Sequence, residues 1–415
     1  MNLKSITVIG AGTSGYLTVY YLCNNFPEIA INWIRPAISY PIGVGEASVP
    51  RVQQFLSNLG ISSADIIARC NGSLKLGLKF DGFYKKDKTF FHPFGNNEEE
   101  QSLILESWRQ NKVPNDVLSF DDIATHFDVV QLMQFLDERL EGFSNINIIQ
   151  QQATIDTVDG DVIVDCTGFG RSIINTEFKS INTSIPNNTA LVYRSEYTDT
   201  EKQRVPYTTC TAMNYGWVWN IPLGDKLSFG YVHDDTYDVK DEFVDYLTSV
   251  LHTEVDSSSI RCIKMKTGRN EEHVVEGEKT VVGIGLSSCF IEPLESTGLY
   301  LIVCGIELLD QYLRSNITAD EFNHSINCEF DTILNFILAH YKYTQNDNCY
   351  WNFYKDLQVD NFKENNIFPY TSWEYILDGM GQYTKNTKRP PIKEMLRLLK
   401  QSSYNQWLDN EKYIR

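Results

Sequence analysis

The sequence predicts a mixed α/β fold that combines a parallel βαβ core, an inserted antiparallel sheet and a helical carboxyl-terminal region. Three observations support this prediction. A strand, a helix and a second strand follow one another within residues 5–34, β-rich segments alternate with turn residues over 189–232, and apolar residues repeat at three- and four-residue steps after Gly298. The chain has 415 residues, more than one hydrophobic core usually organises, so we expect a fold of two parts.

The amino terminus has the pattern of a βαβ unit. Residues 5–9 form a short apolar, β-branched run that stops at Gly10. Residues 14–24 suit a helix, and residues 30–34 form a second apolar run. Because a parallel pair of strands needs a crossover of this kind, the pattern predicts the start of a parallel sheet.

A G-x-G-x-x-G turn joins the first strand to the first helix, with glycines at Gly10, Gly12 and Gly15. Glycines at this spacing permit a tight turn and let the backbone approach a pyrophosphate that faces the amino terminus of the helix. The position of the turn, directly after a strand and at the start of a helix, favours a dinucleotide site over an ordinary turn. We expect these glycines, together with Thr13 and Ser14, to bind the cofactor.

The end of the second strand departs from the usual dinucleotide pattern. An acidic residue normally binds the ribose hydroxyls there, but this chain has Arg35 between Ile34 and Pro36. A guanidinium suits a phosphate better than a hydroxyl. The sequence therefore leaves open how the ribose is bound and offers Arg35 as a phosphate contact.

The later elements follow from their periodicity. Residues 128–143 carry one apolar helical face, and strand-like pieces follow at 146–150 and 161–166. Segments of β-rich sequence separated by Pro and Gly over 189–232 predict an antiparallel sheet. The stretch 341–383 is rich in aromatic residues, which indicates either core packing or a flat aromatic pocket.

These patterns suggest four parts along the chain. We expect a cofactor-binding part with the βαβ start and a strand that carries Lys79, a sheet that forms the substrate part, a return to the cofactor-binding part with a long helix, and helices that cover the substrate. Their expected ranges are 1–188, 189–280, 281–340 and 341–415.

Composition narrows the class of protein. There are 36 Lys and Arg residues against 54 Asp and Glu, for a formal charge of −18, so most of the surface repels a phosphate backbone and nucleic acid is not an expected partner. The nine cysteines are scattered without a C-x-x-C pair, which argues against a disulfide framework and a metal site. No signal peptide and no uncharged apolar run of about 18 residues is evident, so a soluble, cytoplasmic protein without a membrane partner is expected.

Several catalytic motifs are missing from the sequence. There is no Gly-Lys dipeptide for a phosphate-binding loop of the Walker type, no H-E-x-x-H and no G-x-S-x-G. Kinase, zinc protease and hydrolase functions are therefore not favoured. We expect a bound cofactor to carry the difficult chemistry.

Three further segments are more specific. They are 43–50, which reads GVGEASVP, 216–222, which reads GWVWNIP, and 290–298, which reads FIEPLESTG. Together with the glycine turn, they resemble the flavin-dependent halogenase family typified by tryptophan halogenases. The W-x-W-x-I-P run is the most specific of them. Shorter matches lie at 75–80, 92–95, 165–169, 340–341, 350–351 and 372–373, so the likeness covers most of the chain, and its compact build suggests a divergent, phage-like member.

The resemblance implies an FAD-binding, Rossmann-like domain of the flavin monooxygenase type. It also implies a two-component enzyme, in which a separate NAD(P)H-dependent reductase supplies reduced FAD, and oxygen and halide then give hypohalous acid. An electron-rich aromatic small molecule takes the halogen. In this resemblance Glu46, Ala47 and Leu286 join the cofactor-binding residues.

The resemblance also assigns site residues. Lys79 matches the lysine that holds the oxidant by a hydrogen bond or as a haloamine, and Glu295 and Ser296 match its catalytic neighbours. Other matches serve the halide, the tunnel and the substrate pocket: Thr297, Gly298, Trp217, Trp219, His92 and Phe94. From pattern alone, Lys79 fits the solvated face of a half-buried strand, and the tryptophans fit sheet packing.

Two alternative functions remain at this point. A single-component FAD-dependent aromatic hydroxylase would share the glycine turn, and a flavin-binding regulatory or structural protein would share the fold without turnover. The native substrate, its regiochemistry, the preferred halide and homo-oligomer formation are left open by the sequence.

Overall fold

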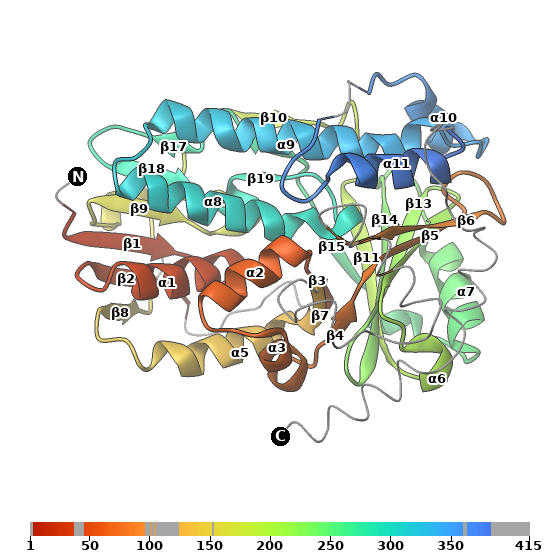
Figure 1. Cartoon of the computed structure of the whole chain (residues 1–415), viewed down its shortest axis with the longest axis horizontal. Coiled ribbons are helices and arrows are strands. Elements are labelled where there is room, and N and C mark those ends of the chain that lie inside the picture. The colour runs from red at the N-terminus through yellow and green to blue at the C-terminus, as the bar shows by residue number, and fades with distance from the viewer. Residues whose placement is uncertain are drawn as a thin grey trace. The chain divides into compact units, whose positions relative to one another are not determined.

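The computed structural model describes residues 3–36, 45–95, 101, 104, 124–151, 153–359 and 363–382. It divides the chain into two compact units, each assembled from three segments (Figure 1). The first unit contains residues 1–43, 128–185 and 265–333, and the second contains 44–127, 186–264 and 334–415.

A six-stranded sheet forms the centre of the first unit, in the order β17-β18-β9-β1-β2-β8. All pairs are parallel except β17 with β18. The strands are β1 (Ser5–Ile9), β2 (Ala30–Ile34), β8 (Ile146–Ile149), β9 (Val162–Asp165), β17 (Val274–Val275) and β18 (Thr280–Gly283). Ile6 and Val8 in the central strand β1 are fully buried, as expected for a parallel strand covered on both faces. The predicted βαβ start is confirmed.

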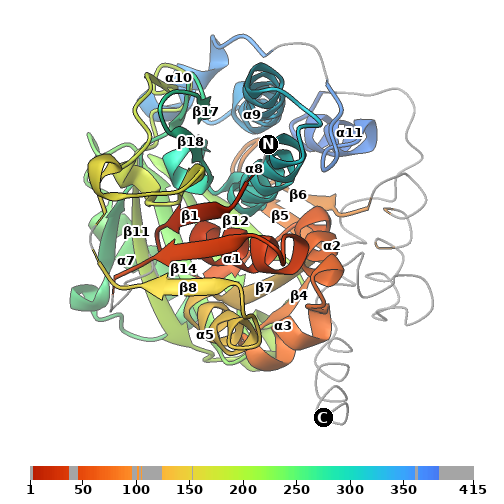
Figure 2. The same cartoon turned by 90° about the vertical axis from the view of Figure 1, so that its left-hand side faces the viewer.

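Four helices accompany this sheet: α1 (Thr13–Asn25), α5 (Val129–Leu140), α8 (Thr297–Leu313) and the first part of α9 (Ala319–Lys342). Helices α8 and α9 run side by side in both Figure 1 and Figure 2, and the Tyr300 hydroxyl on α8 donates a 2.8 Å hydrogen bond to Glu329 on α9. A second sheet in this unit has the order β10-β16-β19 and consists of β10 (Phe178–Ser180), β16 (Gly268–Asn270) and β19 (Cys289–Phe290).

A seven-stranded sheet, in the order β15-β11-β14-β13-β12-β5-β6, forms the second unit. Its strands are β5 (Gly77–Asp81), β6 (Thr89–Pro93), β11 (Thr189–Glu196), β12 (Thr208–Met213), β13 (Gly216–Pro222), β14 (Lys226–His233) and β15 (Arg261–Lys264). The predicted antiparallel pairing is confirmed from β11 to β14. The strand that carries Lys79, however, pairs in parallel with β12, so it belongs to this sheet and not to the cofactor-binding part where we expected it.

Helix α7 (Lys240–Leu251) covers one face of the seven-stranded sheet. Its apolar side, which includes Phe243 and Leu247, packs in one cluster with Val218, Phe229 and Tyr231 of the strands. All five side chains are fully buried. The alternation of strand residues therefore assigns Val218, Phe229 and Tyr231 to the α7 face.

The second unit also contains a three-stranded sheet, β3-β7-β4, with β3 (Gly45–Ala47), β4 (Ser73–Lys75) and β7 (Ala124–Asp128). Its other described helices are α2 (Pro50–Asn58), α3 (Ser63–Arg69), α6 (Thr200–Gln203), the last part of α9, α10 (Cys349–Lys355) and α11 (Tyr370–Gly379). The predicted helical end is represented by α10 and α11, the latter ending at Gly379, and residues 383–415 lie outside the described residues. No described helix combines the length and apolar character needed to cross a bilayer.

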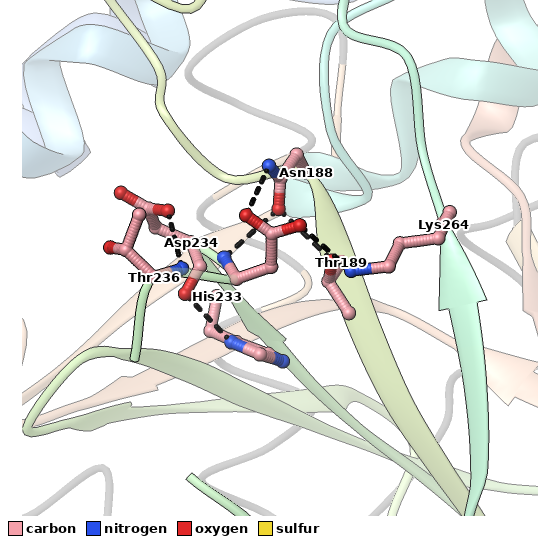
Figure 3. A network of polar contacts seen from close by, with 7 residues as sticks. Asn188, Thr189, His233, Asp234, Thr236 and Lys264 are labelled. Atoms are coloured by element: carbon pink, nitrogen blue, oxygen red, sulfur yellow. Dashed lines mark hydrogen bonds and ion pairs between the residues drawn. The ribbon is translucent and has the colours of Figure 1, made fainter. Parts of the chain in front are cut away.

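A polar network fixes the turn after β14 to β11 and β15 (Figure 3). The Asn188 amide donates to the Asp235 carboxylate at 2.9 Å, and its oxygen accepts from the Asp235 backbone N–H at 3.0 Å. The Lys264 ammonium contacts the Asp235 carboxylate at 2.8 Å and the Thr189 hydroxyl at 3.0 Å. The Lys264 side chain is 62% exposed. An ion pair of this exposure contributes little stability, so the network mainly fixes the position of the turn.

Candidate active site

The glycine turn of the first unit has the geometry that a pyrophosphate requires. Gly10 has φ of +123°, and a Cβ atom there would lie 2.2 Å from the Cys166 carbonyl oxygen. A Cβ at Gly15 would lie 2.3 Å from the Gly10 carbonyl oxygen. A Cβ at Gly12, in contrast, would have no described atom within 4 Å. Two glycines thus serve close packing, whereas Gly12 leaves the backbone open to a ligand.

The amino terminus of α1 is also suited to an anion. Gly12 is its N-cap, and within the described chain no side chain caps this end and no acidic residue occupies the first turn. Thr13 and Ser14 begin the helix, so their backbone N–H groups are at its positive end. Ser14 also packs against the turn at Gly285, where a Cβ would lie 2.6 Å from the Ser14 Cβ. This turn carries Leu286, so the structure brings two predicted cofactor-binding segments together, and they fit FAD.

Arg35, at the end of β2, is held by protein groups. Its guanidinium donates to Asp137 at 2.8 Å and to the Tyr16 hydroxyl at 2.7 Å, and its carbon lies 4.2 Å from the centre of the Trp33 ring. The Trp33 indole in turn donates to the Gly10 carbonyl at 2.8 Å. Arg35 therefore supports the glycine turn through β2 and α5, and its contact with a phosphate stays a prediction.

The segment that precedes α8 has an unusual backbone. Glu295 and Ser296 are consecutive non-glycine residues in the left-handed region, with φ of 62° and 60°. Such positions cost about 1–3 kcal/mol each and are concentrated at functional sites. Glu295 and Thr297 are buried, and the Ser296 side chain makes no capping hydrogen bond to α8. The turn thus holds a buried carboxylate and the open start of a long helix close together in the chain, while the predicted roles of Ser296, Thr297 and Gly298 stay untested.

Glu46 and Ala47 lie in β3 of the second unit. Burial raises the pKa of the Glu46 carboxyl to about 7, although its side chain keeps partial exposure. Desolvation disfavours the charged form of a carboxyl group, so Glu46 exchanges a proton near neutral pH. The other end of this predicted motif, Gly43 and Val44, lies outside the described residues.

The two tryptophans of β13 lie on one face of the seven-stranded sheet. Their ring centres are 6.3 Å apart, and both side chains are at most 5% exposed. Trp219 packs over Gly230 of the neighbouring strand, where a Cβ would come within 2.0 Å of the indole ring. Neither indole N–H has an acceptor among the described residues. The two neighbouring indole rings are therefore closely packed on this sheet face, and their N–H groups have no acceptor among the described residues.

Lys79 does not share that face. Across the sheet Lys79 pairs with Thr209 and Phe91, whereas Trp219 pairs with Cys210, which pairs with Phe80. Paired residues point to the same side and consecutive residues to opposite sides, so Lys79 projects away from the tryptophans. Its ammonium group contacts the Asp81 carboxylate at 2.7 Å, and the Lys79 side chain is 22% exposed. The structure therefore does not bring Lys79 onto the sheet face that carries the tryptophans.

Lys75, in β4 of the same unit, is buried, whereas Lys79 is partly exposed. It is fully buried, its ammonium donates to the Ser48 carbonyl at 3.0 Å, and its Nζ lies 4.9 Å from the centre of the Phe94 ring. Phe94 contacts the His92 ring, and His92 pairs with Leu78, which shares the tryptophan face with Phe80. Lys75 therefore extends toward the side of the sheet that carries the tryptophans.

The sequence offered no clear signal for Lys75. From Leu74 to Lys79 the chain alternates apolar and other residues, which predicts that both lysines lie on one face. The structure breaks this strand between β4 and β5, and Gly77 at the break has φ of +156° and would place a Cβ 2.3 Å from the His92 carbonyl oxygen. The two lysines consequently belong to different sheets. Only the presence of a glycine in the alternation pointed to this break.

Aromatic rings continue the tryptophan face within the second unit. Phe83 contacts Trp217, Tyr341 and Trp351, and Phe80 contacts His340. Of these residues, Tyr341 and Trp351 lie in the aromatic-rich stretch 341–383, for which the sequence left core packing and a flat pocket open. Their rings are buried, so core packing is established, and a role in substrate binding stays a prediction.

Comparison with known proteins identifies the family of this chain. A family model described as tryptophan halogenase matches residues 5–147 and 137–391. The chain belongs to the tryptophan halogenase family. It is 27% identical to the tryptophan 7-halogenase RebH of Lentzea aerocolonigenes, over 89% of this chain and 82% of that protein, and 26% identical to the tryptophan 6-halogenase ThaL of Streptomyces albogriseolus, over 87% and 81%. Among solved structures, the flavin-dependent halogenase BrvH from Brevundimonas sp. BAL3 has a TM-score of 0.80 at 23% identity, covering 98% of this chain and 99% of that one.

Membership of the tryptophan halogenase family confirms the predicted class. The protein is a flavin-dependent halogenase with an FAD-binding, Rossmann-like fold, and it uses reduced FAD, halide and oxygen on an aromatic substrate. The aromatic hydroxylase is consequently the less supported alternative.

Proposed function

We propose that this protein halogenates an electron-rich heteroaromatic small molecule of the indole class, and that Lys75 is the amine that directs the halogen. The observation that carries this proposal is the position of Lys75, a fully buried ammonium beside Phe94 on the side of the sheet that holds Trp217 and Trp219. The curated relatives named for tryptophan as substrate support the indole class.

Lys75 suits this role because its ammonium group is buried and is held by groups of the protein. Phe94 offers the face of an aromatic ring, which attracts a cation, and the Ser48 carbonyl fixes one N–H direction. As an ammonium, Lys75 would donate a hydrogen bond to the oxygen of hypohalous acid and polarise the O–X bond, whereas as a neutral amine it would form a haloamine. Either route uses the same buried nitrogen. When bound, reduced FAD supplies, together with oxygen, the oxidising equivalents that convert halide into hypohalous acid.

Halogen transfer to the arene needs a base as well. The C–X bond forms as the O–X bond breaks, the ring carbon loses its proton, and oxygen leaves as water. We assign proton removal to Glu295, a buried carboxylate in a strained turn that keeps one orientation. Thr297 and Gly298, at the positive end of α8, are proposed to bind halide.

The tryptophan pair is proposed to exclude the arene from the flavin. Two large buried rings at alternate positions of β13 form a wall on one face of the sheet, and Trp219 cannot move toward Gly230 without a clash. Oxygen would then reach the arene only as hypohalous acid. A separate NAD(P)H-dependent reductase is proposed to supply reduced FAD.

An isotope experiment separates halogenation from hydroxylation. The full-length enzyme is incubated with FAD, a flavin reductase, ¹⁸O₂ and bromide, and with tryptophan, indole or a phenol as substrate. Mass spectrometry should detect a product in which bromine replaces hydrogen and no ¹⁸O is incorporated. A product that contains ¹⁸O and forms equally well without bromide would instead identify a hydroxylase.

A further inference from the structure

His126 is the centre of a buried polar network in the second unit. It lies in β7, the middle strand of the three-stranded sheet, and its side chain is fully buried. Its Nδ1 lies 3.0 Å from the Ser73 hydroxyl oxygen, and its Nε2 lies 2.9 Å from the Thr208 hydroxyl oxygen. Both ring nitrogens are therefore engaged by hydroxyl groups.

The direction of these hydrogen bonds follows from the neighbouring groups. The Ser73 hydroxyl donates its single proton to the Pro222 carbonyl, which can only accept. Ser73 must then accept from His126, so Nδ1 carries a proton. Burial is the main cause that holds the pKa of His126 well below its usual range, and the positive charge of Lys75 is the second. The ring is therefore neutral. Nε2 is consequently an acceptor, and the Thr208 hydroxyl donates to it.

This network joins the strands that carry the proposed chemistry. Ser73 precedes Lys75 by two residues in β4, so both side chains leave the same side of that strand. Pro222 ends β13, the strand of Trp217 and Trp219. A change at the imidazole therefore reaches the backbone of the lysine strand and the end of the tryptophan strand through one hydroxyl group.

We propose that His126 is a positioning residue for halogen transfer, a neutral imidazole protonated at Nδ1 that fixes Ser73 and thereby the direction in which Lys75 extends. The inference rests on the proposed role of Lys75. A neutral ring keeps a second positive charge away from the buried Lys75 ammonium, and its two hydrogen bonds leave it one orientation. His126 touches no reacting atom in this scheme.

The test compares His126→Asn with His126→Leu in the full-length, FAD-loaded enzyme. An Asn amide can donate to Ser73 and accept from Thr208, whereas Leu fills the space without either hydrogen bond. We measure halogenated product per reduced FAD oxidised, with a soluble scavenger that reports escaped hypohalous acid. His126→Leu should oxidise flavin at the wild-type rate, lose product yield and kcat by about tenfold to a hundredfold at unchanged KM, and release more oxidant, because small displacements of a reacting group have effects of this size. His126→Asn should restore most of the yield.

Full product yield in His126→Leu, or no recovery in His126→Asn when both variants fold, would overturn the inference. Nitrogen-15 NMR of the wild-type imidazole provides a test that does not depend on a variant folding: a signal from a neutral ring with Nδ1 protonated is expected, and a charged or Nε2-protonated ring would refute it. Lys75→Met separates this inference from the proposed function. If that variant keeps full activity, the role of Lys75 is wrong. If Lys75→Met is inactive while His126→Leu is normal, only the inference about His126 is wrong.

Discussion

The glycines of the phosphate-binding turn are required for different physical reasons. Gly15 is packed against the Gly10 carbonyl, while Gly12 faces open space among the described residues. The sequence motif predicted the geometry of this turn because its glycines act locally, between β1 and α1. It could not tell which glycine serves packing and which serves the ligand, since that depends on what lies opposite each Cα.

Two alanine substitutions test this difference. Gly12→Ala should fold with wild-type thermal stability and bind FAD about tenfold more weakly, because the new methyl group meets the ligand and not the protein. Gly15→Ala should lower stability by several kcal/mol, since its Cβ would lie 2.3 Å from the Gly10 carbonyl oxygen. Thermal unfolding and titration with FAD measure the two effects. Equal loss of stability in both variants would contradict this assignment.

Glu46 predicts a pH dependence of stability. Its folded-state pKa of about 7 lies above the ordinary value of 4.5 because of burial. Between these values the folded state binds more protons than the unfolded state, so the free energy of unfolding falls as pH rises from about 4.5 to 7. Glu46→Gln should remove this loss and be more stable than the wild type at pH 8 by about 1–2 kcal/mol, with no gain at pH 4.5. Urea unfolding of both proteins at pH 8 and pH 4.5 measures this difference in stability. An equal difference at both pH values would refute the raised pKa of Glu46.

The two lysines show what a sequence pattern alone does not decide about facing and burial. Lys75 and Lys79 are four residues apart in a segment that alternates apolar and other residues. The resemblance to the family matched Lys79, and not Lys75, to the lysine that holds the oxidant. The structure assigns Lys79 to the face opposite Trp219, beside Asp81, and buries Lys75 against Phe94. Burial and facing depend on the partners of a strand, and these partners lie far away in the sequence.

At the scale of elements, a buried histidine connects the segment before Glu295 to α9 through hydrogen bonds, and we call this connection the His273 clamp. His273 is fully buried, and its ring nitrogens lie 2.6 Å from the Ser288 hydroxyl and 3.0 Å from the Asn327 amide oxygen of α9. Ser288 lies just after the turn that carries Leu286 and before β19. The clamp thereby ties the segment that leads to Glu295 to a long helix of the same unit.

This clamp should weaken in acid. Burial lowers the pKa of His273 from 6.5 to about 4, so between these values the unfolded state binds the extra proton. The stabilisation is complete above pH 6.5 and is lost as pH falls toward 4, by about 3 kcal/mol in all. His273→Gln should be less stable at pH 7 and show a flatter decline between pH 6.5 and 4.5. Chemical unfolding across this range measures the slope, and an unchanged slope would argue against the clamp.

At the scale of the whole molecule, the chain alternates between two units, each built from three separate segments. The elements themselves were predictable, because β1, α1, β2, α5 and α8 have clear local periodicity. The division into units was not, because it depends on pairings such as that of β5 with β12, more than a hundred residues later in the chain. The expected boundary at residue 188 lies close to the change of unit after Ile185, whereas the changes of unit after residues 43 and 127 follow strand pairing.

The central claim is that Lys75, and not Lys79, directs the halogen, and a matched pair of variants tests it most directly. Lys75→Met and Lys79→Met keep similar side-chain length and remove the amine. With reduced FAD, oxygen, bromide and tryptophan, Lys75→Met should still oxidise flavin but lose about a hundredfold or more of the brominated product, while Lys79→Met should stay within about twofold of the wild type. Loss of product in Lys79→Met with full activity in Lys75→Met would contradict the account.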